Sequence, residues 1–197
     1  MRVAVAFELE KSSDKLEIPW ESPDPAIRYV NLRENPNAID QIEEARRYRP
    51  LRNFLAAVNS ADSVFSTSKC DTWLNRDVRE EGAQPPAEPY EFASYTDLVF
   101  ALEEYNFERG HYEGLTNRLA ELLTREPATD ALRAELCVRR CHYRAVDRWG
   151  YCLTIFLHAR GASAEQAELR WSLGLARLQQ ALMFTSRVIR HLLSQAS

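Results

Sequence analysis

The chain has 197 residues, within the range of one domain or two small ones. Its hydrophobic content of 45%, charged content of 27% and net charge of −4 are ordinary for a soluble globular protein, and give no basic field for nucleic acid or an anionic membrane. No apolar run approaches the roughly 18 residues of a membrane span, and four cysteines do not make a disulfide framework. We therefore expect a cytoplasmic protein with free thiols and neither nucleic acid nor a membrane as a partner.

The first third of the chain predicts two strands and a helix. Alternating apolar residues predict a strand over residues 3–9, with the odd-numbered side chains forming a buried face. A proline-containing loop over residues 11–25 leads to a second strand over 27–33. A helical pattern then runs over about 39–58, in which Pro50 either kinks one helix or separates two short ones.

The middle of the chain predicts an edge strand, a central strand and a helix. Residues 63–73 are polar for a strand, which favours the edge of a sheet. After a link over 75–89, the end of a strand over 92–102 is apolar on both faces, as in a strand covered on both sides. A helix over about 108–125 ends before Pro127, because the residue preceding a proline avoids the α region.

The last third predicts a hairpin followed by the longest helix. Strand-like runs over 137–146 and 151–158 flank Gly150, which can adopt the positive φ of a tight turn. Ser163 is a favourable N-cap, and Gln166 three residues later completes a capping-box pattern.

The C-terminal helix carries apolar residues at helical spacing as far as Leu193. Some thirty residues at ~1.5 Å per residue would make a rod of roughly 45 Å, long enough to cross a small domain. Its main apolar stripe comprises Trp171, Leu175, Leu178, Leu182, Ile189 and Leu193. A second set predicts that more than one face is buried: Leu169, Leu173, Met183, Phe184 and Val188.

Together these segments predict one α+β domain over residues 1–197. We expect roughly six mostly antiparallel strands and three helical elements, in the order β-β-α three times, with loops 11–25 and 75–89 as the mobile parts. If the three units pack alike, the links 11–25, 75–89 and 147–150 lie at one end of the sheet and the strand-to-helix junctions at the other. Either end is then a candidate binding site, because function concentrates in loops held by a rigid scaffold.

The familiar catalytic motifs are missing from the sequence. It has no Gly-rich phosphate loop, Gly-x-Ser-x-Gly elbow, His-Glu-x-x-His or Cys-x-x-Cys. The densest group of metal-ligand types consists of Cys137, Cys141, His142, Cys152 and His158. Strand alternation places Cys141 and His142 on opposite faces, which does not suit a closed zinc site. We expect structural thiols, no metal and no cofactor.

A first polar cluster consists of Arg140, His142 and Arg144, which alternate along the fifth predicted strand in continuation of its core-facing row. Because a buried guanidinium needs a carboxylate partner, such a row is unusual, and it could line an anion-binding cleft. Alternatively, the strand extends past the core and these side chains are solvated or paired with acids on neighbouring strands.

A second polar cluster lies near the junction of the central strand and its helix, and comprises Asp97, Glu103 and His111. Two carboxylates at the mouth of a buried strand can act as acid and base when their pKa values differ. Acids close to a helix start are also simple partners of the helix dipole, which is the interpretation we favour.

Three functional interpretations follow from these observations. We favour a binding or interaction protein without catalytic activity, which binds a protein partner or a ligand at one end of the sheet. Trp20 and Trp149, in or next to the loops, are candidate partner contacts, or they fold down over the core. The second interpretation is a small enzyme or ligand-binding protein whose cleft uses the two polar clusters. The third is a homo-oligomeric subunit joined through the polar strand 63–73 or the long helix.

Overall fold

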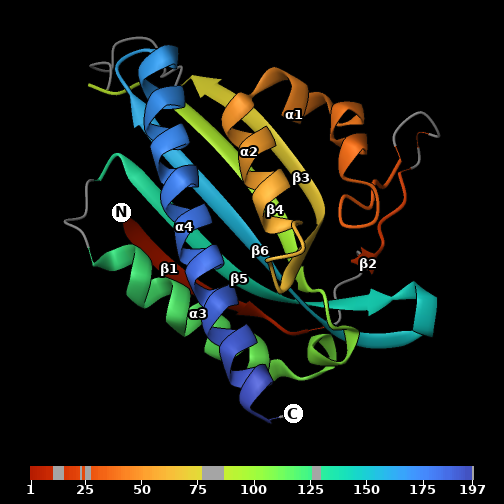
Figure 1. Ribbon diagram of the computed structural model, residues 1–197. Helices are drawn as coiled ribbons and strands as arrows, with labels where there is room; N and C mark the ends of the chain where they lie inside the picture. The colour runs from red at the N-terminus through yellow and green to blue at the C-terminus, as the bar shows by residue number, and fades with distance from the viewer. Residues whose placement is uncertain (11–15, 23, 25–27, 77–86, 126–129, 197) are drawn as a thin grey trace.

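The computed structural model describes residues 1–10, 16–22, 24, 28–76, 87–125 and 130–196. It has an α+β fold in which a six-stranded mixed sheet carries α2, α3 and α4 on one face (Figure 1). In chain order the elements are β1 (Arg2–Glu8), β2 (Glu17–Ile18), η1 (Pro36–Gln41), α1 (Glu43–Arg47), α2 (Arg49–Val58), β3 (Phe65–Arg76), β4 (Tyr90–Phe100), η2 (Glu103–Phe107), α3 (Arg109–Thr124), β5 (Leu132–Tyr143), η3 (Arg144–Val146), β6 (Arg148–Gly161) and α4 (Ala164–Ala196).

The strands are ordered β1-β5-β6-β4-β3, and the short β2 pairs with β5. The pairs of β1 and β2 with β5 are parallel, and the other three pairs are antiparallel. The predicted mostly antiparallel sheet is therefore confirmed. The polar strand lies at an edge as predicted, and β4 and β6 lie inside the sheet.

The core lies between the helices and one face of the sheet. Leu98 of β4 and Leu153 and Ile155 of β6 point into it and are almost fully buried. Trp171 of α4 is completely buried there, and its indole N–H donates a hydrogen bond to the Ser94 hydroxyl (2.8 Å). The buried indole nitrogen thus has the partner that it needs in an apolar core.

The N-terminal unit differs from the prediction. The described residues of 27–33 form no strand, and the second strand is β2, inside the predicted loop. The Asn31 side chain accepts a hydrogen bond from the Arg33 backbone N–H (3.1 Å), and the Arg33 guanidinium donates to the carbonyls of Ser60, Ser63 and Phe65. These bonds hold residues 31–34 as a turn, so the second strand of the first unit is only the two-residue β2, and the predicted threefold β-β-α order is not fully confirmed.

Strand β1 does not bury the face that its alternation predicted. Val3 packs against the core, but Val5 and Phe7 are exposed. The reason is topological, because β1 is an edge strand whose main contacts are with β5 and α3. The following helical segment is divided rather than kinked. Tyr48 has an extended backbone between α1 and α2, and Pro50 lies in the first turn of α2, where its missing N–H is not needed.

The hairpin turn lies before the predicted glycine. The chain turns through η3 and Asp147, which has a positive φ of 49°, whereas Gly150 lies inside β6. A Cβ on Gly150 would come within 2.6 Å of the Asn106 carbonyl oxygen. Glycine is therefore required here for close packing and not for a turn.

The links between strands do not gather at one end of the sheet, contrary to the prediction. Tyr90 at the start of β4 pairs with Gly161 at the end of β6, whereas the β5–β6 turn lies at the opposite end. The junctions into α3 and α4 are likewise at opposite ends. Most of the loops in which we expected mobility, residues 11–15 and 77–86 among them, lie outside the described residues.

The long C-terminal helix is confirmed and contains 33 residues. The Ser163 hydroxyl accepts a hydrogen bond from the Gln166 backbone N–H (3.2 Å), and the Gln166 side chain accepts one from the Ala162 N–H (2.7 Å). Trp171 and the leucines of the main stripe as far as Leu182 are buried, but Leu169 and Leu173 are exposed. The second apolar set therefore does not form a buried face, because α4 is the outermost layer and one of its sides faces solvent.

Candidate functional site

The face of the sheet opposite the helices, which we call the open face, is covered at one end by described residues. There Ile18 of β2 packs with Cys141, Tyr143 and Cys152 in a small second hydrophobic cluster. Next to this cluster the Trp20 indole N–H donates to the Ser68 carbonyl (2.8 Å). The described part of the N-terminal segment thus closes the open face near the β5–β6 turn and does not extend over the other end, which we call the accessible end.

Asp97 is a buried acid on the covered part of the open face. Its carboxylate accepts a hydrogen bond from the Thr154 hydroxyl (2.6 Å). Burial raises the pKa of Asp97, although the Thr154 hydrogen bond and the charges of Arg139 and Lys69 act in the opposite direction. Removal of the carboxylate from water is thus the dominant effect on its protonation.

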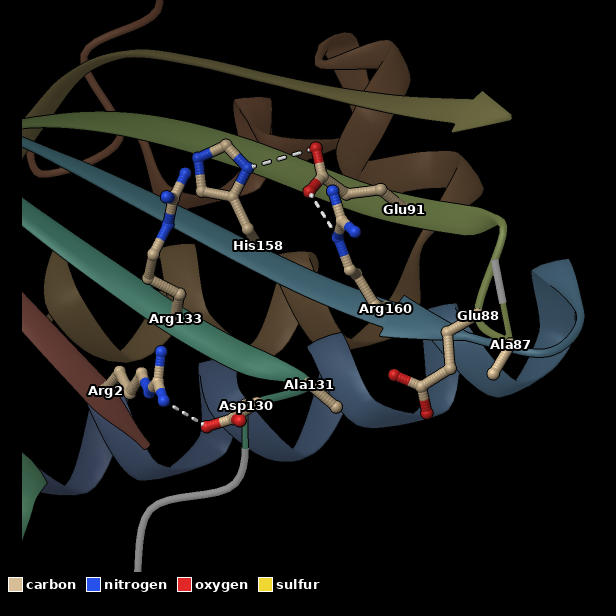
Figure 2. A pocket seen from close by; sticks show the side chains of 9 residues that line it. All are labelled: Arg2, Ala87, Glu88, Glu91, Asp130, Ala131, Arg133, His158 and Arg160. Carbon is tan, nitrogen blue, oxygen red and sulfur yellow. Dashed lines mark hydrogen bonds and ion pairs between the residues drawn. The ribbon is translucent and has the colours of Figure 1, made fainter. Parts of the chain in front are cut away.

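A cavity of about 560 Å³ lies at the accessible end of the open face, where β4 and β5 begin and β6 ends (Figure 2). Its walls come from four strands and from the residues just before β4 and β5. The lining residues are Arg2, Ala87, Glu88, Glu91, Asp130, Ala131, Arg133, His158 and Arg160. Six of these nine carry a formal charge, so this is a strongly polar cavity.

Strand register places three of these side chains in one row. Arg2 of β1 pairs with Arg133 of β5, which in turn pairs with His158 of β6. Directly paired residues point to the same side of a sheet, so their side chains are neighbours on the open face. Figure 2 shows Arg133 and His158 extending side by side from adjacent strands.

Each carboxylate of the cavity has an arginine partner. The pairs are Glu88 with Arg170, Glu91 with Arg160 (3.6 Å) and Asp130 with Arg2 (2.6 Å). Oε1 of Glu91 also lies 3.4 Å from Nδ1 of His158, and this contact holds the imidazole through one of its two nitrogens. The acidic groups are therefore already neutralised within the described part of the chain.

Arg133 differs from the other charged residues of the cavity. Its side chain makes neither an ion pair nor a hydrogen bond within the ranges that the structure describes. A guanidinium offers five N–H donors in a planar fork that matches a carboxylate or a phosphate. With His158 beside it, Arg133 provides a place for a negatively charged group.

The predicted cleft of Arg140, His142 and Arg144 does not form part of this cavity. Arg140 stacks over the Trp149 ring, and Arg144 pairs with Glu17 and Glu21. His142 is buried, with Nε2 2.9 Å from the Asp147 carboxylate. The sequence left open whether these three side chains line an anion-binding cleft or pair with neighbouring groups, and in the structure they pair with neighbouring groups. The Nδ1 atom of His142 has no partner among the described residues.

Asp97, Glu103 and His111 are not brought together. Asp97 is buried on the open face, and Glu103 is exposed at the start of η2. His111 belongs to α3 on the other side of the sheet, where Nδ1 lies 3.1 Å from the Tyr105 carbonyl oxygen. Strand β4 ends at Phe100, so the shared strand face assumed for Asp97 and Glu103 does not extend to Glu103.

The two candidate partner contacts are both half-buried. Trp20 folds onto β3, and the Lys69 ammonium lies 5.2 Å from its ring centroid. Trp149 lies edge-on to His142 in the β5–β6 hairpin, with ring centroids 5.4 Å apart. Neither tryptophan lies in the cavity of Figure 2.

The sequence did not indicate the residues that line the cavity. Arg133 and His158 are 25 positions apart in the numbering, and Arg2 joins them only because β1 pairs with β5. One signal was present, since Arg133 and His158 both alternate with apolar residues and so face away from the core. The described residues contain no group of metal ligands, and none of their helices is long and apolar enough to cross a membrane.

Comparison of the chain with models of protein families, with curated proteins and with solved structures found no match. What the site can bind is therefore inferred from its own geometry and charges.

Proposed function

We propose that this chain is a binding protein that holds the anionic group of a small ligand against Arg133 and His158 in the open-face cavity. The observation that carries the proposal is the Arg133 guanidinium, which has no partner among the described residues, in a cavity whose three carboxylates are each paired with an arginine. A carboxylate or phosphate of the ligand would complete the charge pairing of the site.

The dimensions of the cavity support a small ligand. Its volume of about 560 Å³ lies within the range of ~300–1,000 Å³ that is usual for small-molecule sites. Charged groups lie on most of its walls, which favours a polar molecule over a hydrophobic one. The site also lies at one end of the sheet, which agrees with the binding protein that the sequence favoured.

The surroundings of His158 support a role in orienting the ligand. Its side chain is largely buried, and Glu91 holds the ring through Nδ1. With Nδ1 donating to the carboxylate, Nε2 is the nitrogen left to face a ligand, and in this tautomer it accepts a hydrogen bond from an N–H or O–H next to the anionic group of the ligand. Arg133 would then supply a two-point contact to the anion, with His158 as its neighbour.

The test is a titration of the protein with small anions, in which binding is measured by calorimetry or by NMR of backbone amides. The probes are inorganic phosphate, citrate and a nucleoside monophosphate. Binding should produce amide shifts around Arg133 and His158. In the Arg133→Gln variant the affinity should fall about ten-fold or more, because a hydrogen bond to a charged group is worth ~1.5–3 kcal/mol.

The matched control is Arg139→Gln. Arg139 lies on the same strand, and its Nε donates to Glu8 (2.9 Å), away from the cavity. This variant should keep the affinity of the unmodified protein. Equal weakening by both variants, or no binding of any probe at millimolar concentration, would contradict the proposal.

A further inference from the structure

His158 offers the open-face cavity a nitrogen that accepts a hydrogen bond. Its Nδ1 lies 3.4 Å from Oε1 of Glu91, and a carboxylate oxygen accepts but does not donate. The proton of the neutral imidazole therefore lies on Nδ1, and Nε2 keeps its electron pair. Nε2 makes no hydrogen bond to any residue that the structure describes, and Figure 2 shows it on the side of the ring that faces Arg133. A ligand can bond to this nitrogen only with an N–H or an O–H.

Arg133 requires the opposite kind of group from the same ligand. Its guanidinium only donates hydrogen bonds, and its side chain has no partner in the described part of the chain. Strand register places Arg133 directly opposite His158, so the two side chains project side by side from β5 and β6 (Figure 2). A molecule that bonds to both must therefore carry an anionic acceptor and a donor next to each other.

The charge balance of the cavity favours a ligand with one negative charge. Together with Arg170, which pairs with Glu88, the described residues around the cavity supply four arginines and three carboxylates. One positive charge is therefore in excess, and a single carboxylate of the ligand balances it. An amino acid does not, because its ammonium group places a further positive charge near Arg133, and like charges repel.

A phosphate group meets only one of the two hydrogen-bonding requirements. A phosphate monoester is almost fully dianionic at a pH of about 8, since its second pKa is about 6, and its oxygens then only accept hydrogen bonds. It suits the Arg133 guanidinium but leaves Nε2 of His158 without a donor. A carboxylic acid with a hydroxyl on the adjacent carbon atom meets both requirements, because the hydroxyl donates a hydrogen bond and carries no charge.

We infer that the ligand of this site is an α-hydroxy acid, whose carboxylate binds the Arg133 guanidinium and whose hydroxyl donates a hydrogen bond to Nε2 of His158. This inference rests on the proposed function and adds the chemical class of the ligand. The carboxylate and the hydroxyl are on adjacent carbon atoms, which matches two side chains at directly paired positions of β5 and β6. Glu91 is then a positioning residue, because it fixes the proton on Nδ1 and so makes Nε2 the acceptor.

The experiment compares lactate, propanoate and alanine, which share one carbon skeleton and differ only in the group next to the carboxylate. Their affinities for the full chain are measured by NMR of backbone amides at a pH of about 8, where an imidazole is ordinarily neutral. Lactate, in its better-bound enantiomer, should bind about five-fold more tightly than propanoate, because it makes one more hydrogen bond. Alanine should bind more weakly than lactate because of its ammonium group.

The outcomes separate this inference from the proposed function. Equal affinities of lactate and propanoate, or tighter binding of alanine or inorganic phosphate than of lactate, would overturn the inference and leave the anion site itself standing. If neither these acids nor any of the small anions named above bound, the proposed function would fail, and the inference would fail with it.

Two variants assign the preference for lactate to a particular side chain. His158→Phe keeps an aromatic ring but has no acceptor nitrogen, so lactate and propanoate should bind to it equally well. Arg133→Gln should weaken the binding of both acids and leave the ratio of their affinities unchanged. A preference for lactate that persists in His158→Phe would contradict the inference.

A measurement on the unmodified protein tests the same hydrogen bond without any substitution. NMR spectra that correlate ring nitrogens with ring protons distinguish the two tautomers of a neutral imidazole. In the free protein Nδ1 of His158 should carry the proton, and lactate, but not propanoate, should shift the resonance of Nε2. A proton on Nε2 in the free protein, or equal shifts with both acids, would contradict the inference.

Discussion

The covered and open faces of the sheet are built from alternate residues of the same strands, yet they have opposite character. On β6, Leu153 and Ile155 are buried under α4, whereas Phe156 and His158 point to the open face and are half-buried. The covered face is apolar because three helices exclude water from it. The open face can keep charged groups because no described helix covers its far end. Substitutions at neighbouring residues of one strand should therefore have different effects: those on the covered face should change stability, and those at the anion site on the open face should change ligand binding.

The largest expected effect comes from the covered face. Ile155→Ala should lower the free energy of unfolding by ~2–5 kcal/mol, because it leaves a cavity in the packed core. The matched change Phe156→Ala on the open face should have a smaller effect, since that ring already contacts solvent. Denaturant melts of both variants measure the difference. A loss below about 1 kcal/mol for Ile155→Ala would place its side chain outside the core.

The covered end of the open face, around the second hydrophobic cluster, should be as sensitive to added side-chain volume as the main core. Gly150→Ala should cost ~1–3 kcal/mol, because the methyl group would lie 2.6 Å from the Asn106 carbonyl oxygen and 2.9 Å from Tyr143. Gly174→Ala is the comparison, where the closest atom belongs to the flexible Leu132 side chain. Thermal melts should rank Gly150→Ala as the more damaging change; the reverse order would show that the second cluster is loosely packed.

Asp97 should make stability depend on pH. Burial raises its pKa above the ordinary 3.8, so below that value the carboxyl is protonated in both the folded and the unfolded chain. As the pH rises through the window between the unfolded and folded pKa values, only the unfolded chain ionises, and the folded state loses stability. Asn cannot ionise, so the stability of Asp97→Asn relative to the unmodified protein should increase with pH over this window.

Denaturant melts at a series of pH values from about 3.8 upward measure this effect. Asp71→Asn is the control, because Asp71 is exposed on the neighbouring strand β3. The control should show no comparable change with pH. If the difference in unfolding free energy between Asp97→Asn and the unmodified protein were also constant over this pH range, burial would not govern the ionisation of Asp97.

The smallest effect should come from the rim of the anion site. Arg2 and Asp130 form an ion pair whose side chains are 63% and 80% exposed. Exposed pairs of this kind contribute little because water screens them, so Asp130→Asn should change the unfolding free energy by less than about 1 kcal/mol. A larger loss in a denaturant melt would mean that ion pairs at the accessible end of the open face stabilise the fold as strongly as core packing does.

Local pattern was sufficient for the elements whose periodicity is long and regular. The apolar strands β4 and β6, the α3 helix and the extended α4 were all predicted, because each depends on the spacing of its own side chains. Short or turn-dominated segments were not predicted. Residues 31–34 became a turn through the side chains of Asn31 and Arg33, and the Arg33 contacts reach carbonyls about thirty positions away.

The sequence by itself determined which side chains of each long strand share a face, because alternation follows from backbone geometry. It therefore already separated Ile155 from Phe156, and Arg133 from its apolar neighbours. Only the tertiary structure decided that β1 joins β5 in parallel, which brings Arg2 beside Arg133, and that β6 brings His158 to the same row. Strand order and register come from pairing between distant segments, and no local spacing of residues specifies them.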